Sequence, residues 1–218
     1  MNKKNIYEEK NDNYYSLIRP DLIQMIEGSN NRILEVGCGE GQTGGALKKC
    51  GKAKEVVGIE LVEGPAKRAE KRLDKVIRGD VEEITLPFPP EYFDYIIMGD
   101  VIEHLIDPWS TLKKMSQFLS SRGYLIASIP NISYWKVLAD LILLDKWEYQ
   151  PAGILDKTHL RFFTRGTISK MFTECGFKIE LIVSVGSTRT ITRLLNLITF
   201  NLSSKFFTAK YFVKTKKI

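Results

Sequence analysis

The sequence predicts an α/β fold built on a doubly wound parallel sheet. Short apolar runs alternate with segments whose charges recur at helical spacing, which is the rhythm of consecutive β-α-β units. The runs are apolar enough to be buried on both faces, as parallel strands are. A turn with glycine at alternate positions, Gly37, Gly39 and Gly41, follows the first run. Because ligands of such sheets bind beyond the carboxyl ends of the strands, we expect the functional site at that edge.

The length and composition indicate one globular domain. The 218 residues suffice for a single domain, 1–218, with a substantial core and are few for two. No apolar run approaches the roughly 20 residues of a membrane span, and the N-terminus lacks the apolar core of a signal peptide. The three cysteines are odd in number and lack metal-type spacing, so we expect reduced thiols and a cytoplasmic protein.

The net charge of +6 is concentrated near the C-terminus, where no acidic residue follows Glu180. The rest of the chain is close to neutral, which argues against a nucleic-acid-binding surface over the domain. Two interpretations of the basic segment stay open. It is either a solvated tail or a surface attracted to an anionic substrate or membrane.

The N-terminal part, residues 1–28, is expected to form a cap before the sheet. Pro20 opens a short helix over 21–26, whose apolar positions share one face. The first strand then stops at Glu35, the glycine-rich turn follows, and a helix is expected over 46–50.

The middle of the chain supplies four further strands. After a proline-rich loop and the fourth strand, Asp107 is expected to cap a helix that begins at Pro108. The expected strands are 55–60, 75–80, 93–98 and 123–129, and the expected helices are 63–73 and 108–119.

Two insertions precede the last strands. We expect an acceptor-side insertion over 131–163, helix-like over 133–144, and an amphipathic helical insertion over 187–205. Between them, Thr164 is expected to cap a helix that ends at Gly176. The last two strands are expected over 177–185 and 207–215.

Polar side chains stand where the expected strands end. Glu35, Glu60, Asp80, Asp100 and Asn131 each lie at or just past a strand terminus. Because the carboxyl ends of parallel strands meet at one edge, these residues should converge on a single ligand site. This convergence is stronger evidence for a site than the glycines alone.

The glycine-rich turn lets a ligand lie directly against the backbone. Gly39, Gly41 and Gly44 fit the dinucleotide pattern G-x-G-x-x-G, but the turn would then begin two residues late. Glu35 and Glu40 also place carboxylates where a pyrophosphate needs a neutral or basic cradle. Acids suit a cation better, and S-adenosylmethionine carries a sulfonium and an ammonium but no phosphate.

Five motifs in order give the chain a family resemblance. It resembles class I S-adenosylmethionine-dependent methyltransferases and, within them, the ubiquinone-type bacterial group that includes members associated with surface-polysaccharide synthesis. The resemblance implies a Rossmann-like, seven-stranded, mostly parallel sheet whose last strand is antiparallel, with S-adenosylmethionine as cofactor. The motifs are Ile-Leu-Glu-Val-Gly-Cys-Gly-Glu-Gly at 33–41, Gly-Ile-Glu at 58–60, Gly-Asp-Val at 79–81, Phe-Asp-Tyr-Ile-Ile-Met-Gly-Asp-Val-Ile-Glu-His-Leu at 93–105 and Asp-Lys-Thr-His-Leu-Arg-Phe-Phe-Thr at 156–164.

The resemblance implies roles around the cofactor, from its methionine end to its adenine. Glu35 and the turn would hold the methionine end, and the single carboxylate of Glu60 would accept both ribose hydroxyls. Asp80 would accept the adenine amino group. Alternatively, Glu60 and Asp80 only cap the helices that follow them. The implied cofactor-binding residues are Arg19, Glu35, Gly37, Cys38, Gly39, Gly41, Glu60, Leu61, Asp80, Val81 and Gly99.

Two of these implied contacts involve the ends of the methionine moiety. The Gly99 carbonyl would accept from the cofactor ammonium. Arg19 would bind the cofactor carboxylate, although a surface ion pair explains Arg19 equally well.

The acceptor side is expected around the two histidines of the chain, His104 and His159. A base is needed only if the acceptor is a hydroxyl or a protonated amine, and His159 is our preferred base. An ordinary hydrogen-bonded histidine is the alternative. Asp100, Glu103 and His104 are spaced i, i+3, i+4, so they would share one face of a helical turn.

The same acid-x-x-Glu-His spacing resembles a set implicated in divalent metal binding in some ubiquinone-pathway O-methyltransferases. Two carboxylates and one imidazole make only a partial oxygen-rich site, so we favour structural hydrogen bonds and assign no metal. We therefore take His159, His104 and Asp100 as the candidate catalytic residues. Aromatic residues are expected either to form a lid over the acceptor or to pack in the core, namely Tyr14, Tyr15, Tyr134, Trp135 and Trp147.

The expected function is methyl transfer from S-adenosylmethionine to a small molecule, with a sugar or lipid-linked glycan hydroxyl or amine favoured by the resemblance. A catalytically silent binding or scaffold protein and a nucleic-acid methyltransferase are the alternatives. The basic, amphipathic segment 189–205 would suit a membrane surface, and its alternatives are a cover for the sheet or a homodimer interface.

Overall fold

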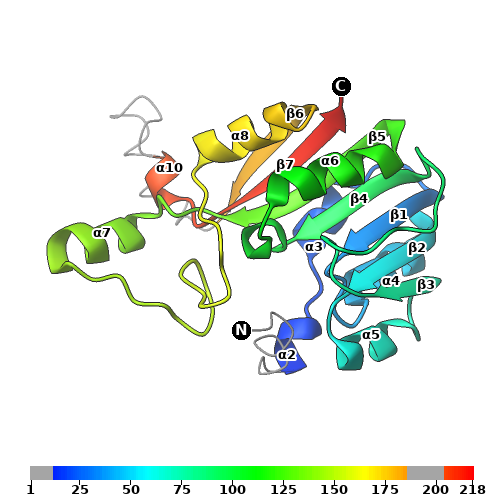
Figure 1. Cartoon of the computed structure of the whole chain (residues 1–218), viewed down its shortest axis with the longest axis horizontal. Coiled ribbons are helices and arrows are strands. Elements are labelled where there is room, and N and C mark those ends of the chain that lie inside the picture. The colour runs from blue at the N-terminus through cyan, green and yellow to red at the C-terminus, as the bar shows by residue number, and fades with distance from the viewer. Residues whose placement is uncertain (1–11, 186–203) are drawn as a thin grey trace.

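The computed structural model describes residues 12–185 and 204–218. Its centre is a seven-stranded sheet in the order β3-β2-β1-β4-β5-β7-β6 (Figure 1). The predicted insertion over 187–205 lies almost wholly outside the described residues. The strands are β1 Asn31–Val36, β2 Ala53–Glu60, β3 Lys75–Arg78, β4 Phe93–Gly99, β5 Leu119–Pro130, β6 Phe177–Val185 and β7 Lys210–Lys217.

The strand directions confirm the predicted fold class. The strands from β3 through β5 pair in parallel, whereas β7 is antiparallel to both β5 and β6. The chain moves outward from β1 to β3 and then returns to place β4 on the other side of β1. Strand order therefore reverses between β1 and β4, which is the point where open α/β sheets bind ligands.

The helices divide between the two faces of the sheet and bury two separate clusters. One cluster joins the sheet to α6 and α8, and the other joins it to α3, α4 and α5. Neighbouring residues of β1 illustrate the division, because Leu34 belongs to the first cluster and Ile33 to the second. The helices are α2 Asp12–Tyr15, α3 Pro20–Gln24, α4 Gln42–Lys49, α5 Glu63–Ala69, the 3₁₀ turn η1 Ile102–His104, α6 Pro108–Phe118, α7 Trp135–Leu144, α8 Arg165–Glu174 and α10 Ser204–Phe207.

Local capping signals were accurate guides to helix ends. The Asp107 carboxylate accepts from the backbone N–H of Ser110 at 3.0 Å and starts α6. Thr164 forms a reciprocal capping box with Thr167 at the start of α8. Gly176 follows this helix with a φ of 81°.

Other expected boundaries were wrong. Helix α4 begins at Gln42, four residues before the expected start at residue 46, because packing of its glycines overrides their low helix propensity. Helix α5 ends at Ala69 rather than at residue 73. Strand β7 begins at Lys210, since Phe207 ends α10.

Gly44 and Gly45 are adjacent in α4 but have opposite surroundings. A Cβ on Gly44 would lie 2.6 Å from Leu73 Cδ2 and 2.7 Å from Glu35 Oε2, whereas one on Gly45 would meet only Arg72, at 3.5 Å. Gly44→Ala is expected to lower the free energy of unfolding by about 1–2 kcal/mol through overpacking. Gly45→Ala should raise it by about 0.5–1 kcal/mol through helix propensity. Urea unfolding of both variants tests this, and shifts of the same sign would contradict it.

The region after β5 extends away from the sheet. Helix α7 projects from the body of the domain (Figure 1), and Val137 is its buried apolar residue. Ile142, Leu143 and Leu144 at its end are 67–76% exposed. None of the helices within residues 12–185 and 204–218 has the length and hydrophobicity that crossing a lipid bilayer requires.

Candidate functional site

A cavity lies at the carboxyl ends of β1, β2 and β4, where the strand order reverses. It contains about 880 Å³ of empty space, part of it open to solvent. The predicted site residues line it except Gly41, Asn131 and His159. Asn131 is buried and instead donates from its side-chain amide to the carbonyl oxygens of Lys205 and Thr208, each at 2.7 Å. The lining consists of Tyr14, Tyr15, Leu17, Arg19, Glu35, Val36, Gly37, Cys38, Gly39, Thr43, Ile59, Glu60, Leu61, Gly79, Asp80, Val81, Gly99, Asp100, Val101, His104 and Leu105.

The N-terminal cap packs against the glycine-rich turn. Gly39 has a φ of 54°, and a Cβ there would stand 2.6 Å from the carbonyl oxygen of Tyr15. The same carbonyl accepts from the backbone N–H of Glu40 at 2.9 Å. Glycine is therefore required at position 39 both for its conformation and for this close approach.

Gly41 does not line the cavity, so the prediction that it contacts the cofactor is not supported by its position. It is the N-cap of α4 with a φ of 73°, and a Cβ would lie 2.9 Å from Leu73 Cγ. Its role is to start the helix and to let Leu73 pack closely. Glu40, the other acid of the turn, pairs instead with Arg68 at 2.8 Å.

Glu35 is a buried acid at the floor of the cavity. It is 5% exposed, and its Oε2 accepts from the backbone N–H of Gly44 at 3.0 Å. Burial raises the pKa of Glu35 to about 7, although the Gly44 N–H and the charge of Arg19 lower it in part. The cavity thus holds a carboxylate that is half ionised near neutral pH and fully ionised above it.

The raised pKa of Glu35 gives a prediction whose sign depends on pH. An acid with a pKa of about 7 folded and 4.5 unfolded costs stability that grows as the pH rises between those values and is absent below them. Glu35→Gln should therefore raise the free energy of unfolding by about 2–3 kcal/mol at pH 8 and by less than about 1 kcal/mol at pH 5.

The same variant should weaken binding of a cationic ligand about tenfold at pH 8, because the carboxylate charge is lost. Chemical denaturation at the two pH values, with calorimetric titration of S-adenosylmethionine, measures both effects. A stability change that is equal at pH 5 and pH 8 would contradict the assignment.

Glu60 ends β2 and connects the turn to the next helix. Its two oxygens accept from the backbone N–H groups of Gly39 and Val62, each at 2.9 Å. Burial raises the pKa of Glu60 and these N–H groups lower it. Each carboxylate oxygen has a further lone pair, so the capping contacts leave acceptor capacity toward the cavity. Asp80 likewise accepts from the N–H of Glu82 at 2.9 Å.

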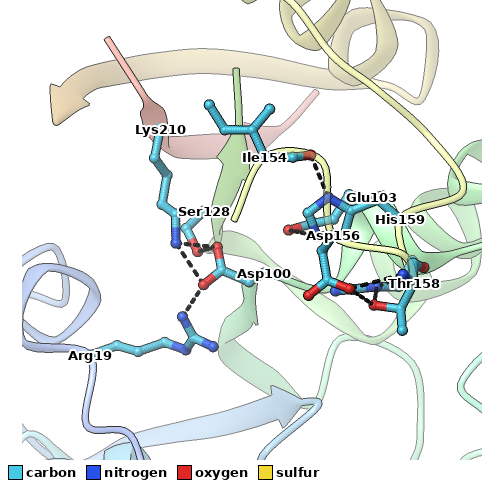
Figure 2. A network of polar contacts seen from close by, with 10 residues as sticks. Arg19, Asp100, Glu103, Ser128, Ile154, Asp156, Thr158, His159 and Lys210 are labelled. Carbon is cyan, nitrogen blue, oxygen red and sulfur yellow. Dashed lines mark hydrogen bonds and ion pairs between the residues drawn. The ribbon is translucent and has the colours of Figure 1, made fainter. Parts of the chain in front are cut away.

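Asp100 is neutralised by cations from distant parts of the chain. It pairs with Arg19, accepts from Lys210 Nζ at 2.8 Å and accepts from the Ser128 hydroxyl at 2.8 Å (Figure 2). Burial alone would raise the pKa of Asp100, but Arg19 and Lys210 together lower it. Asp100 therefore joins the N-terminal cap to β4, β5 and β7.

Lys210 is a site residue that sequence reasoning missed. Because β7 is antiparallel, its first residue lies at the edge where the parallel strands end, opposite Pro130 of β5. The sequence did contain a signal for this position, because a lysine at the start of an antiparallel last strand lies at the ligand-binding edge of the sheet.

The expected face of Asp100, Glu103 and His104 is not formed. Only 102–104 are helical, as the short turn η1, and Asp100 precedes it with a φ of 55°. Glu103 and His104 instead meet His159 from the 131–163 region, so that one potential ligand atom of each residue lies within 4.8 Å of the others. Figure 2 shows Asp100 with Lys210 and Arg19 in one group and Glu103 with His159 in another.

Backbone contacts orient both imidazoles of this cluster. His159 Nδ1 lies 2.9 Å from the carbonyl oxygen of Ile154, and His104 Nδ1 lies 3.1 Å from that of Thr158. A carbonyl only accepts, so each Nδ1 carries a proton, and in the neutral form of either ring the lone pair lies on Nε2. The Thr158 hydroxyl donates to Asp156 at 2.7 Å, which is consistent with this assignment.

The three members of the cluster are all buried. Glu103 is 1% exposed, and burial, reinforced by the charge of Asp100, raises its pKa well above the ordinary range. Burial and the neighbouring His159 lower the pKa of His104 to about 4, so His104 is neutral at physiological pH. The rings of His104 and His159 meet edge to face with centroids 4.7 Å apart. His104 lines the cavity, and the cluster therefore borders it.

The aromatic residues proposed as a lid do not form one group. Tyr14 and Tyr15 line the cavity and contact each other edge to face, with centroids 5.0 Å apart. Trp147 packs on Phe162 at 5.6 Å, and Phe162 lies 6.4 Å from the ring of His159. The two remaining residues of the set, Tyr134 and Trp135, stand at the start of α7.

Comparison with known proteins gives consistent results. A family model described as a methyltransferase domain matches residues 7–182. Demethylmenaquinone methyltransferase of Staphylococcus aureus (strain JH9) is 29% identical over 167 residues, which cover 67% of each chain.

Solved structures of similar fold are more distant in sequence. A SAM-dependent methyltransferase from Thermotoga maritima has a TM-score of 0.68 at 21% identity, covering 98% of this chain and 99% of that one. One from Archaeoglobus fulgidus has a TM-score of 0.64 at 21% identity, covering 91% and 90%. At these identities the likeness shows the shared fold.

Proposed function

The chain belongs to the methyltransferase-domain family, and from that premise we propose that it transfers the methyl group of S-adenosylmethionine to a hydroxyl or amine of a small molecule. The observation that carries the proposal is the acidic cavity at the β1/β4 reversal point. Buried Glu35 and Glu60 stand at its floor, and Arg19, the one arginine that lines it within the described part of the chain, pairs with Asp100.

The charge of the cavity supports S-adenosylmethionine as its ligand. A pyrophosphate would meet the carboxylates of Glu35 and Glu60, whereas a cation is attracted by them. Gly39 lines the cavity, and a side chain there would collide with the carbonyl oxygen of Tyr15, so the turn keeps this shape only with glycine at position 39. Glu60 would accept the ribose hydroxyls, Asp80 and Val81 would hold the adenine, and the Gly99 carbonyl would accept from the ammonium.

The cofactor supplies an electrophilic methyl group on a sulfonium, which is already an excellent leaving group. The chain has to align the acceptor in line with that methyl group and exclude water. Residues 131–163 would contact the acceptor on the side of the cavity that His104 lines, where they bring His159. His159 would take the proton of an acceptor hydroxyl on Nε2, since its Nδ1–H is committed to Ile154.

Two classes of acceptor agree with the observations. The motifs that resemble polysaccharide-associated members favour a sugar or lipid-linked glycan, and the named relative acts on a demethylmenaquinone, which favours a quinone-type ring. The aromatic group of Trp147, Tyr149 and Phe162 beside His159 suits the face of either. A sugar presents a hydroxyl that loses its proton as it is methylated, whereas a quinone-type ring presents a hydroxyl only in its reduced, quinol form.

Lipid-linked acceptors would bring the protein to a membrane surface. The exposed end of α7 supports such contact, and the basic segment 189–205 was proposed for it on sequence grounds. Flotation with anionic and neutral liposomes tests this proposal, and equal recovery with both would exclude an electrostatic contact. Light scattering of the purified protein would report a homodimer.

The decisive experiment combines binding with turnover. Calorimetry should detect saturable binding of S-adenosylmethionine and S-adenosylhomocysteine, and labelled cofactor should methylate a member of a panel of nucleotide sugars and reduced quinones. His159→Ala should abolish turnover with little change in cofactor affinity. Absence of cofactor binding would overturn the proposal. Cofactor binding without turnover on any acceptor class would favour a silent binding protein.

A further inference from the structure

We propose that Glu103, His104 and His159 form a binding site for one divalent transition-metal cation. The trio differs from the one that sequence spacing suggested, because His159 replaces Asp100. The site borders the proposed cofactor cavity through His104, which lines it. It is independent of the identity of the methyl acceptor.

The first argument is the convergence of three donors from two distant segments. Glu103 and His104 come from the turn η1, and His159 comes from the region that follows α7. One potential ligand atom from each lies within 4.8 Å of the other two. A small inward movement of side chains brings such atoms to the 2.0–2.2 Å that nitrogen and oxygen ligands keep from zinc.

The second argument is the carboxyl group of Glu103. Among the residues that the structure describes, neither Oε1 nor Oε2 of Glu103 has a hydrogen-bond partner, and the side chain is 2% exposed. His159 Nε2 is 4.0 Å from Oε1, which is too far for a hydrogen bond. A buried carboxyl without partners is costly, and a cation held between it and the imidazoles would satisfy it.

The third argument is the orientation of the histidines. Metal-binding histidines usually donate the other ring N–H to a carbonyl or carboxylate, which fixes the ring and directs its lone pair at the ion. Here His104 and His159 donate from Nδ1 to the carbonyls of Thr158 and Ile154. Asp156 in turn binds both the N–H and the hydroxyl of Thr158, at 2.9 and 2.7 Å. The outer partners that a metal site requires are therefore present.

The donor set selects the class of cation. Two imidazole nitrogens and one carboxylate suit Zn²⁺, Fe²⁺ or a similar transition-metal ion and leave coordination positions open. Mg²⁺ and Ca²⁺ prefer oxygen ligands and would gain little from the imidazoles. Asp100 is unavailable as a fourth ligand because Arg19 and Lys210 already neutralise it.

A bound cation changes the role of His159. Coordination uses the Nε2 lone pair, so in the metal-loaded protein His159 is a ligand and the base role proposed above does not apply. His159→Ala then impairs turnover in either case. Metal binding therefore has to be measured directly, apart from activity.

The test is calorimetric titration of Zn²⁺ into the full chain, freed of any purification tag and stripped with a chelator. Cys50→Ser serves as the background, because Cys50 is an exposed thiol that can bind zinc by itself. The wild-type site should bind one equivalent of Zn²⁺, and Mg²⁺ should bind far more weakly. Co²⁺ gives a second readout, since coordination by imidazole changes its visible absorption.

Three variants and one matched control locate the site. Glu103→Gln, His104→Ala and His159→Ala should each weaken Zn²⁺ binding beyond the roughly 10- to 100-fold that loss of an outer partner causes. The control Glu63→Ala should stay within about twofold of wild type, because Glu63 is an exposed residue that pairs with Lys67 and Arg78. Asp100→Asn removes a charge that acts on Glu103 without ligating the cation, so it should change Zn²⁺ binding less than loss of a ligand does. The side chains of Glu103 and His159 do not line the cavity. An unchanged affinity of Glu103→Gln and His159→Ala for S-adenosylmethionine would therefore show that their fold is intact.

The outcomes separate this inference from the proposed function. If the protein binds the cofactor but has no saturable Zn²⁺ site, the metal site alone is overturned. The same holds if the three variants bind Zn²⁺ as tightly as the wild-type site does. Zn²⁺ binding that Asp100→Asn abolishes would make Asp100 a ligand and overturn the trio proposed here. Zn²⁺ binding without cofactor binding overturns the methyl-transfer proposal and leaves the metal site standing.

Discussion

Glu60→Ala is expected to weaken S-adenosylmethionine binding about 100- to 10,000-fold, the largest change in affinity we expect from one substitution. Its carboxylate would accept two ribose hydroxyls, and hydrogen bonds to a charged group contribute about 1.5–3 kcal/mol each. The substitution also removes the acceptor of the Gly39 and Val62 N–H groups, which shape the turn. Calorimetric titration measures the effect directly.

Glu63→Ala is the matched control for this prediction. Glu63 lies three residues later, where its exposed carboxylate pairs with Lys67 at 2.8 Å and Arg78 at 2.7 Å. Exposed pairs contribute about 1 kcal/mol or less, so cofactor affinity and stability should stay near wild type. If Glu60→Ala folds natively and binds the cofactor as tightly as Glu63→Ala does, Glu60 only caps the turn and does not contact the cofactor.

Asp100→Ala should produce the largest loss of stability, about 2–4 kcal/mol in the free energy of unfolding. Removing one partner of a fully buried ion pair costs about 3–5 kcal/mol. We expect a smaller loss for Asp100→Ala because Arg19 and Lys210 keep part of their contact with solvent. The loss leaves two cations, from the N-terminal cap and β7, facing each other without a counter-ion. Alanine at a φ of 55° adds backbone strain.

Asp100→Asn removes the charge of Asp100 without adding backbone strain, because asparagine tolerates the left-handed region. It therefore separates the contribution of the charge from that of the backbone. The pKa of Asp100 is lowered in the folded protein from 3.8, so the stability that its charge contributes is present above that value and is lost as the pH falls through the folded pKa. Wild type and Asp100→Asn should therefore differ at pH 7 and converge in acid. Denaturant unfolding across this range checks it, and a constant difference would assign the effect to geometry.

Local sequence signals determined much of the fold. The cap residues Asp107 and Thr164 marked their helices because a side-chain oxygen beside an unsatisfied N–H acts over three residues. The strand at 177–185 was predicted with the observed bounds, whereas α4 was predicted four residues late. Its first turn contains Gly44, and only the packing of Leu73 and Val56 against that glycine explains a helix there.

Part of the site could likewise be anticipated from the chain. Glu35, Glu60 and Asp80 were expected at one edge, because parallel strands bring their carboxyl ends together whatever the details of packing. Gly41 matched the same motif but faces Leu73 instead of the cavity. A motif specifies which backbone conformations a turn can adopt, and it does not specify which atoms reach the ligand.

The sequence by itself therefore determined the fold class, the ligand-binding edge and the acidic character of the cavity, because these depend on strand periodicity and on residues close to strand ends. The tertiary structure decided the partners of Asp100 and Glu103. Asp100 was expected to share a face with His104, but Lys210, 110 residues away, holds its carboxylate. Glu103 meets His159 across more than fifty residues. Such pairings depend on the antiparallel return of β7 and the path of the 131–163 region, which no local pattern encodes.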